Sequence, residues 1–308
     1  MYDVVVVGKA NIDYLARGHR LPKPGQSVNG DFFQEAPGGK GANQAVGAAR
    51  LGARVALVAR IGRDARGDAV LASLARSGVD AAHVTRDPAE PTGVALCQVG
   101  PSGEKQILSA AGANARLTAA CVRDAAHALG STRVVLCQLG VPQEAVAEAA
   151  KIGRSAGARI VLDPGPPAPL PDDLLARIDV IRPNASEARL ITGVTVCDKD
   201  SARVAARELL RRGAGAAVVQ AGDQGDLLVT GSEEVWLPRF EVKPVDATGA
   251  GDAFASALAV CLAEGKSLAE SATFASAAAA LATTVLGAQA SLPTREAVRA
   301  LLSRAGSG

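Results

Sequence analysis

The sequence predicts an α/β protein with a three-layer α/β/α fold, a mostly parallel central sheet and a small β lid. Short β-branched runs such as Val4–Val7 alternate along the chain with stretches of helical period. Continuous apolar strands that are each followed by a helix are typical of a parallel sheet covered on both faces. Residues 13–38 and 92–111 interrupt this alternation with strand-like residues and no helix between them. They predict hairpins outside the main sheet, within one domain spanning residues 1–308.

The elements follow in order from apolar runs and helical periods. The candidate buried strands are Val4–Val7, Val55–Val58, Val134–Leu136, Ile160–Leu162, Val180–Ile181 and Ala217–Val219. The candidate helices are Lys40–Leu51, Asp68–Ser77, Gln143–Ala156, Ser186–Leu190, Lys199–Arg212, Gly251–Glu264 and Ser267–Leu286. In the lid, turn signals at Asn29-Gly30 and Pro101-Ser102-Gly103 separate the strands. The lid either decorates the surface or covers a site at the carboxyl ends of the main strands.

Composition and charge narrow the classes of protein. The 308 residues are 48% hydrophobic, which is ample for a buried core, and 33 basic against 31 acidic residues leave a net charge of +2. Such a weak field implies neither nucleic acid nor an anionic membrane as a partner. Five scattered cysteines and no visible signal peptide predict reduced thiols and a cytoplasmic protein. Three histidines without ligand spacing argue against a zinc site.

The strongest local signal is the run Val245–Phe254, in which a Gly-rich turn leads into an amphipathic helix. Backbone N–H groups at a helix start attract anions, and glycines let a phosphate approach closely. Asp252 lies at this helix start and has two interpretations. In the first, its side chain caps the helix. In the second, it is the general base for a hydroxyl that attacks a phosphoryl group. The second would explain why a carboxylate points at a phosphate site, which is electrostatically unfavourable unless the carboxylate takes up a proton.

Two further motifs carry polar groups suited to a ligand. Residues 38–45 place two glycines before a helix, with Lys40 and Asn43 one turn apart. These residues either bind the hydroxyl groups of a sugar or form an ordinary helix start with a solvated lysine. The pattern is neither a Walker motif nor a GxGxxG fingerprint. Asn11 and Asp13 follow the first strand and are two positions apart, so their side chains point to the same side of an extended chain. They either bind a ligand at the carboxyl end of the strand or form a turn.

A fourth motif follows the candidate strand Val180–Ile181. Asn184 is placed to cap the next helix, with Glu187 at the position from which a side chain reaches back to the cap. This capping box lacks only the usual Ser or Thr, and it accounts for the motif by structure alone.

Together these motifs resemble the ribokinase-like (PfkB) family of sugar and nucleoside kinases. Residues 38–46 (GGKGANQAV) match the family's N-terminal signature, and residues 246–252 (DATGAGD) match its C-terminal signature. Residues 184–187 match its NxxE motif, and Asn11 and Asp13 match its sugar-binding pair. The resemblance extends over nearly the whole chain, from Val4 to about Thr294, and includes Gly112-Ala113-Asn114 and Gly287-Ala288-Gln289.

The resemblance implies an ATP-dependent transfer of phosphate to a sugar's primary hydroxyl, with the 5-hydroxyl of D-ribose favoured. By similarity, Asp252 would be the general base. The amides of Gly249, Ala250 and Gly251 would form the anion hole for the transferring γ-phosphoryl group. The residues that would hold the sugar are Asn11, Asp13, Gly39, Lys40, Asn43 and Gly140, together with Asp252.

The resemblance also implies cofactors and a partner. ATP would contact Asn184, Gln220, Gly222, Gly225 and Gly251, with Ser276 near the adenine. Glu187 would act through water on Mg²⁺, which keeps part of its hydration shell. A monovalent cation would order the loop before Asp252, so K⁺ is expected to activate; the matching positions are Asp246, Thr248, Ala282, Val285, Gly287 and Ser291. The lid would build a homodimer, with which the apolar positions Val28, Phe32 and Phe33 are compatible.

Three residues depart from the family's pattern. Gly140 stands where kinases of ribose commonly have a Glu that contacts the sugar, and Cys97 and Ser109 stand in the lid where larger apolar residues are usual. A lost charged hydrogen bond is worth about 1.5–3 kcal/mol, enough to change substrate preference about tenfold. Other sugars, deoxysugars, nucleosides and a non-catalytic sugar-binding sensor therefore stay open as alternatives. A nicotinamide dehydrogenase is disfavoured, because no GxGxxG follows Val4–Val7.

Overall fold

The computed structural model describes residues 1–101 and 104–305 of the chain. These residues contain a nine-stranded sheet with the strand order β13-β12-β11-β10-β9-β8-β1-β4-β5. Neighbours pair parallel from β11 to β5, and β12 and β13 add an antiparallel edge. The mostly parallel sheet is confirmed, with all six candidate strands in it. The strands are β1 (Tyr2–Val7), β4 (Val55–Gly62), β5 (Val84–Asp87), β8 (Thr132–Gln138), β9 (Arg159–Asp163), β10 (Val180–Ile181), β11 (Ala217–Gln220), β12 (Asp226–Val229) and β13 (Glu234–Trp236).

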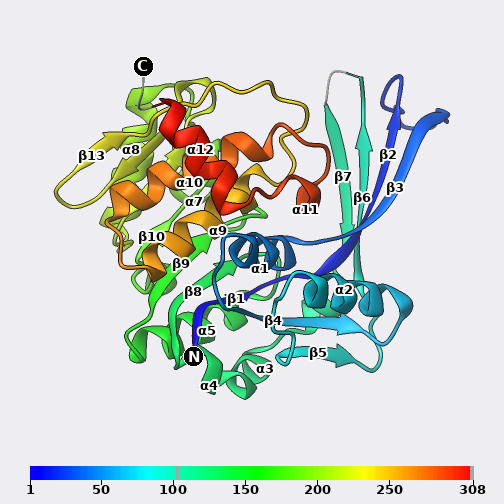
Figure 1. Ribbon diagram of the computed structural model, residues 1–308, viewed down its shortest axis with the longest axis horizontal. Coiled ribbons are helices and arrows are strands. Elements are labelled where there is room, and N and C mark those ends of the chain that lie inside the picture. Colours follow the sequence, from blue (N-terminus) through cyan, green and yellow to red (C-terminus); the bar gives the residue numbers. More distant parts are fainter. Residues whose placement is uncertain (102–103, 306–308) are drawn as a thin grey trace.

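Helices cover both faces of this sheet (Figure 1), which confirms the three layers. β1 shows why, because Val4 and Val6 join the core on one face while Val5 and Val7 join the core on the other. The first face carries α1 (Lys40–Arg50), α2 (Ala65–Arg76), α9 (Ala250–Ala263), α10 (Leu268–Ala282) and α12 (Arg295–Ala305). The second face carries α3 (Ala119–Asp124), α4 (Ala126–Leu129), α5 (Gln143–Ser155), α6 (Asp172–Leu175), α7 (Ala185–Thr192) and α8 (Lys199–Arg211).

The last predicted helix, Ser267–Leu286, is too long at its end. α10 stops at Ala282, because the carbonyl of Thr283 accepts the amides of Val245 and Asp246 at 2.7 and 3.0 Å instead of continuing a helix. The chain then turns into the short α11 (Ala288–Ser291). The end of α10 thus supports the loop that leads into α9.

The lid is a separate four-stranded sheet with the order β3-β2-β6-β7 (Figure 1). Its strands are β2 (Asn11–Gly18), β3 (Gly30–Gly38), β6 (Gly93–Val99) and β7 (Lys105–Ala110). β2 pairs antiparallel with β3, and β6 with β7, so both predicted hairpins are confirmed. The hairpins join through a parallel pairing of β2 with β6 that the sequence did not indicate. Of the predicted turn at Pro101-Ser102-Gly103, Ser102 and Gly103 lie outside the described residues.

The cysteines agree with the prediction of reduced thiols. All five are unpaired, and Cys137 and Cys261 are buried in the core. Burial raises the pKa of the Cys137 thiol to about 12, which keeps it in the unreactive protonated form.

Candidate active site

A cavity of about 460 Å³ lies between the lid and the ends of the main strands. The lid contributes residues from β2, β6 and β7, and the starts of α1 and α9 form much of the rest. The lid therefore covers a hollow site, and surface decoration does not account for it. Residues singled out from the sequence that line the cavity are Asn11, Asp13, Gly39, Lys40, Asn43, Cys97, Ser109, Asn184, Glu187, Gln220, Thr248, Gly249, Ala250, Gly251 and Asp252.

Asp252 lies in the first turn of α9 with only 6% of its surface exposed. The N-cap is Gly249, and no side chain caps this helix, so the interpretation of Asp252 as a cap is wrong. Its Oδ2 accepts a hydrogen bond from Nδ2 of Asn43 at 2.9 Å, and its Oδ1 accepts one from Nε2 of Gln44 at 3.0 Å. Burial raises the pKa of Asp252, and the positive charge of Lys40 opposes that rise. The result is an oriented carboxylate at the cavity wall.

Lys40 stands between two carboxylates. Its Nζ lies 2.8 Å from Oδ2 of Asp163 and 3.8 Å from Oδ1 of Asp252. Nε2 of Gln44 also donates to Oδ2 of Asp163, at 2.8 Å. Burial by itself lowers the pKa of Lys40, but the charges of Asp163 and Asp252 outweigh it and the pKa is raised. Lys40 is thus a permanently charged group at the cavity rather than a solvated lysine at a helix entry.

The predicted anion hole is the turn into α9. Among the described residues, the amides of Gly249 and Gly251 have no hydrogen-bond partner, while the amide of Ala250 donates to the carbonyl of Ala247 at 3.3 Å. Gly249 has a φ of 89°, and a Cβ there would lie 2.8 Å from the carbonyl oxygen of Ala288. Only glycine fits this turn. Two of the three predicted amides are therefore available to an anion.

Arg182, which was not predicted from the sequence, adds a cation to the same wall. It is 6% exposed, its Nε has no hydrogen-bond partner, and its guanidinium carbon lies 4.8 Å from the ring centre of Phe254. A Cβ on Gly251 would lie 3.2 Å from its Nη1, so the guanidinium is beside the anion-hole turn. A buried guanidinium with an unused donor suits a phosphate.

Asn11 and Asp13 lie together at the start of β2, with Nδ2 of Asn11 donating to Oδ1 of Asp13 at 2.6 Å. Both line the cavity from a strand, so the turn-forming interpretation is wrong. Burial raises the pKa of Asp13 to about 6, against the hydrogen bond from Asn11 and the charge of Lys9. Gly39 has a φ of 90° and lies close to Asn11. A Cβ on Gly39 would lie only 2.7 Å from Oδ1 of Asn11, so a larger residue does not fit.

The predicted nucleotide residues are only partly brought together. Asn184 and Gln220 line the cavity, whereas Gly222 and Gly225, at the η2 turn (Gly222–Gln224), do not. Ser276 lies on α10 with its Oγ buried and without a hydrogen-bond partner. The structure therefore places the inner end of the expected ATP site at this cavity and leaves the outer three residues outside it.

Glu187 and Asn184 form the predicted capping box. The amide of Glu187 donates to Oδ1 of Asn184, and the amide of Asn184 donates to Oε2 of Glu187, each at 2.9 Å. Burial raises the pKa of Glu187, and the charge of Asp163 raises it further. No group of three or more His, Cys, Asp or Glu side chains within the described ranges could hold a metal ion. A single carboxylate facing the cavity with one oxygen unused fits a hydrated, ATP-bound Mg²⁺, which needs few protein ligands.

Four of the six positions expected to hold K⁺ form a hydrogen-bonded cluster, namely Asp246, Thr248, Gly287 and Ser291. Among the described residues, no hydrogen bond joins the other two, Ala282 and Val285, to this cluster. Oδ2 of Asp246 accepts the amide of Gly287 at 3.0 Å, and Oγ of Ser291 donates to the carbonyl of Thr248 at 3.4 Å. However, Nζ of Lys105, on β7, contacts both Oδ1 of Asp246 and Oγ1 of Thr248. Oδ1 of Asp246 is therefore already paired with an ammonium, and this positive charge opposes a second cation beside it.

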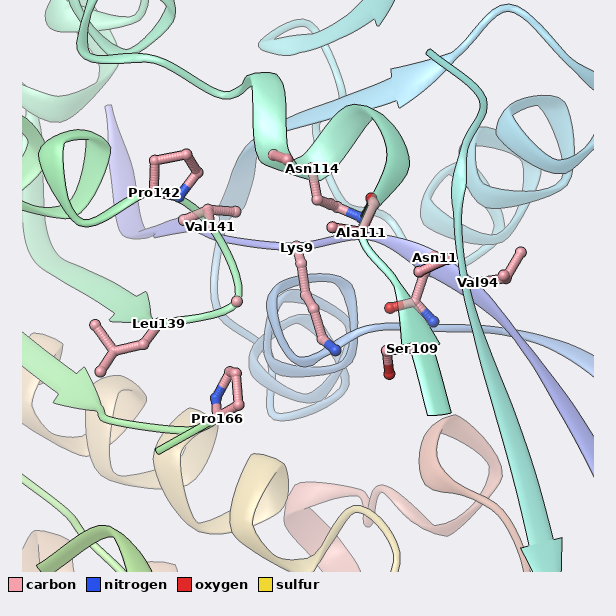
Figure 2. A pocket seen from close by; sticks show the side chains of 13 residues that line it. Lys9, Asn11, Val94, Ser109, Ala111, Asn114, Leu139, Val141, Pro142 and Pro166 are labelled. Carbon is pink, nitrogen blue, oxygen red and sulfur yellow. Dashed lines mark hydrogen bonds between the residues drawn. The ribbon is translucent and has the colours of Figure 1, made fainter. Parts of the chain in front are cut away.

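Gly140 lines a second cavity, of about 290 Å³, that shares Lys9, Asn11 and Ser109 with the first (Figure 2). Lys9 follows β1, and its side chain passes directly over Gly140. The place expected for a glutamate side chain is thus filled by the stem of a lysine.

Five functional residues lie at the site without having been singled out from the sequence, namely Lys9, Gln44, Lys105, Asp163 and Arg182. Asp163 and Arg182 directly follow buried apolar runs, and this position was the signal that could have identified them. Gln44 lies within the motif at 38–45, one turn after Lys40. Lys9 lies two residues after the buried run Val4–Val7, so the same signal could have identified it. Lys105 carries no local pattern, because only the folded lid brings it to Asp246 and Thr248.

Known proteins match this chain over nearly its whole length. Residues 1–295 match the pfkB family of carbohydrate kinases. The chain is 38% identical to a ribokinase of Haemophilus influenzae over 98% of this chain and 99% of that one, and 32% identical to a deoxyribokinase of Salmonella typhi with the same coverage. The structure of an Arabidopsis thaliana ribokinase complexed with ribose and ATP superposes with a TM-score of 0.89 at 33% identity, covering 98% of both chains. In the described part of the chain, no helix has both the length and the apolar character needed to cross a membrane.

Proposed function

The chain belongs to the pfkB family of carbohydrate kinases, and we propose that it transfers the γ-phosphoryl group of ATP to the 5-hydroxyl of D-ribose. It is a phosphotransferase with an alcohol acceptor, as are relatives that match over nearly its whole length. The observation that carries the proposed mechanism is Asp252, whose two oxygens are fixed by Asn43 and Gln44 next to the unused amides of Gly249 and Gly251.

Asp252 accepts the proton of the attacking hydroxyl. Its pKa is raised by burial, so the carboxylate is more basic than an exposed one and better matched to taking a proton near neutral pH. Because Asn43 and Gln44 each donate to one oxygen, the carboxylate cannot rotate away from the hydroxyl. The sugar oxygen then attacks phosphorus as the proton leaves, and the bond to the ADP oxygen breaks.

The charge of the transferring group is stabilised by fixed dipoles and cations. The amides of Gly249 and Gly251 and the start of α9 face the developing negative charge. Lys40 and Arg182 bring positive charge to the same wall of the cavity. These groups are held in place before the substrate arrives, so they need no reorganisation during the reaction.

Asn11, Asp13, Gly39, Lys40 and Asn43 hold the sugar hydroxyls. Asp13 is an acceptor anchored by Asn11, and Oδ1 of Asn43 is buried without a partner, which leaves it ready for a hydroxyl donor. An unsatisfied buried acceptor discriminates strongly against a ligand that lacks the matching hydroxyl. This geometry supports a polyol substrate over an apolar one.

ATP contacts Asn184 and Gln220, which line the same cavity, and Glu187 would hold Mg²⁺ through water. When bound, Mg²⁺ neutralises charge on the phosphate oxygens. The activation by K⁺ that the resemblance implies is opposed by Lys105, whose ammonium contacts Asp246 and Thr248. Exposed apolar side chains on the lid, Phe33, Leu96 and Leu108, support a homodimer through this sheet.

A substrate panel tests the proposed function. ADP release is measured with D-ribose, 2-deoxyribose, D-fructose and adenosine at equal concentrations. We expect kcat/KM for ribose to exceed that for each of the others by about tenfold or more. 2-Deoxyribose and adenosine each lack a hydroxyl that would pair with a buried polar group, and D-fructose has an extra carbon. Higher turnover of 2-deoxyribose or adenosine would transfer the assignment to that substrate, and no ADP release with any sugar would contradict the kinase assignment for the site.

A further inference from the structure

The second cavity contains one charged side chain. Of its lining residues, Lys9 alone carries a charge, and Leu139, Val141, Pro142, Pro166 and Val94 make much of the wall apolar. Figure 2 shows the Lys9 side chain reaching through the middle of this cavity, with its nitrogen between Pro166 and the side chains of Asn11 and Ser109. Its volume of about 290 Å³ corresponds to roughly ten water molecules, enough for a substituent on a sugar.

The ammonium of Lys9 has no direct partner. No hydrogen bond or ion pair of its Nζ is found within the described residues, and the negative charge of Asp13 acts on it only at longer range. Burial lowers the pKa of Lys9, as expected for a cation taken out of water without a contact partner. The hydroxyl of Ser109, which also lines both cavities, has no hydrogen-bond partner in the described part of the chain. Two unused donors thus face the junction of the cavities.

Lys9 and Gly140 depend on each other. A Cβ on Gly140 would lie 2.6 Å from Cδ and 2.8 Å from Cγ of Lys9, so no side chain fits there while Lys9 keeps this position. The pocket therefore carries a positive charge where the family pattern predicts a negative one. A carboxylate at position 140 would accept hydrogen bonds from sugar hydroxyl groups, whereas the ammonium of Lys9 attracts an anion.

We propose that the cavity around Lys9 binds an anionic group, a carboxylate or a phosphate, on a sugar whose primary hydroxyl lies at Asp252. The inference rests on the proposed phosphoryl transfer and concerns a substituted sugar that binds in the same cavity as ribose. Both cavities share Lys9, Asn11 and Ser109, so one molecule can extend from Asp252 past Asn11 to Lys9. The ammonium then gains the partner that the chain itself does not supply.

The test compares anionic and neutral substrates of matched shape. D-Ribonate is paired with ribitol, which tests a carboxylate, and ribose 1-phosphate is paired with methyl ribofuranoside, which tests a phosphate; D-ribose is included throughout. We expect kcat/KM of the wild-type protein to favour the anionic member of at least one pair by about 10- to 100-fold. Lys9→Met should reduce that preference to near one, and Lys9→Arg should retain it.

A double variant keeps the test independent of damage to the fold. Lys9→Ser with Gly140→Glu exchanges the ammonium for a carboxylate in the space that Lys9 vacates, and should reverse the preference toward the neutral member. Thermal melting reports whether each variant is folded. Turnover of ribose with no anionic preference, or a preference unchanged in Lys9→Met, overturns this inference and leaves the kinase assignment intact. No ADP release from any substrate contradicts the proposed function itself.

A separate observation concerns Lys105. Its side chain is 24% exposed and contacts Asp246, whose own side chain is 4% exposed. The amide of Thr248 donates to the same carboxylate at 2.9 Å, so Asp246 connects the lid strand β7 to the turn that forms the anion hole. Burial raises the pKa of Asp246, but the hydrogen bonds from Lys105 and Thr248 outweigh it and lower the pKa to about 2.

We infer that Lys105 supplies from the lid the positive charge that K⁺ was expected to supply. Because this charge belongs to a side chain, the site requires no cation from solution. The same contact connects the lid to the anion-hole turn. With an ammonium in contact with Asp246 and Thr248, an added K⁺ would have to compete with a tethered charge of the same sign. Removing the ammonium while keeping a polar side chain opens those oxygens to a cation.

The test measures activity and melting temperature in K⁺ and in choline. The wild-type protein should show nearly equal turnover and melting temperature in the two salts. Lys105→Gln should lose about tenfold or more of its turnover in choline and recover part of it in K⁺, with a melting temperature that rises only when K⁺ is present. Arg17→Gln, which removes an exposed lid ion pair with Asp31, is the control and should behave as wild type. Strong K⁺ activation of the wild-type protein, or equal K⁺ dependence of wild type and Lys105→Gln, overturns the inference.

Discussion

Asp252→Asn lowers turnover by about three orders of magnitude and leaves the binding of sugar and ATP close to wild type. The amide cannot accept a proton from the attacking hydroxyl, but it keeps the volume of the carboxylate in a site that is 6% exposed. One of its two termini also becomes a donor that meets the amide of Asn43 or Gln44, so the side chain keeps at most one of its two hydrogen bonds. Steady-state ADP release gives kcat, and calorimetric titration of each substrate gives the binding constants.

Two comparisons separate chemistry from folding in this experiment. Glu264→Gln changes a carboxylate at the far end of the same helix, where it is the C-cap of α9 and pairs with Arg295, and should retain wild-type turnover. Thermal melting of Asp252→Asn should show a folded protein. Turnover that stays within about tenfold of wild type would show that Asp252 is not the base, whereas loss of binding together with turnover would assign it to substrate positioning.

The layers and the main strands could be predicted because buried parallel strands leave a local pattern. Val4–Val7 is apolar at every position, since the two faces of β1 enter two different cores. β5 and β13 are the two edge strands and lack such runs, so they were not found. β12 has only the three-residue apolar run Leu227–Val229 and was missed as well. The end of α10 could not be read from its alanine-rich composition either, because a contact with Val245 and Asp246, distant in sequence, ends the helix.

The site was predicted where its residues share one local motif. Gly249, Gly251 and Asp252 belong to a single turn, so their spacing in the sequence already determines that they lie side by side in the structure. Asp163 and Lys105 belong to the site only through partners more than a hundred residues away in the sequence. The parallel pairing of β2 with β6 is of the same kind, since it depends on how two hairpins meet. Such long-range contacts also decided against the solvated interpretation of Lys40.

Lys40→Met lowers turnover at neutral pH by about 10²- to 10³-fold, because a cation facing the transferring phosphate is lost. It also moves the acid limb of kcat/KM to higher pH. The charge of Lys40 lowers the pKa of Asp252 against the effect of burial, so its removal lets that pKa rise. Asp252 must be deprotonated to act as base, and a higher pKa means that the active form is lost earlier as the pH falls. The pH dependence of kcat/KM is the measurement.

The second variant, Lys40→Met with Asp163→Asn, distinguishes this electrostatic role from a structural one. Lys40→Met alone leaves Asp163 without its ion pair at 2.8 Å and should lower the free energy of unfolding by about 3 kcal/mol. Removing the charge of Asp163 as well relieves that penalty, and it withdraws a negative charge that raises the pKa of Asp252. Stability and the acid limb should therefore both return toward wild type, while turnover stays low because the phosphate still lacks its cation. If the acid limb of the single variant does not move, Lys40 does not set the protonation of Asp252. If turnover recovers in the double variant, Lys40 serves only to neutralise Asp163.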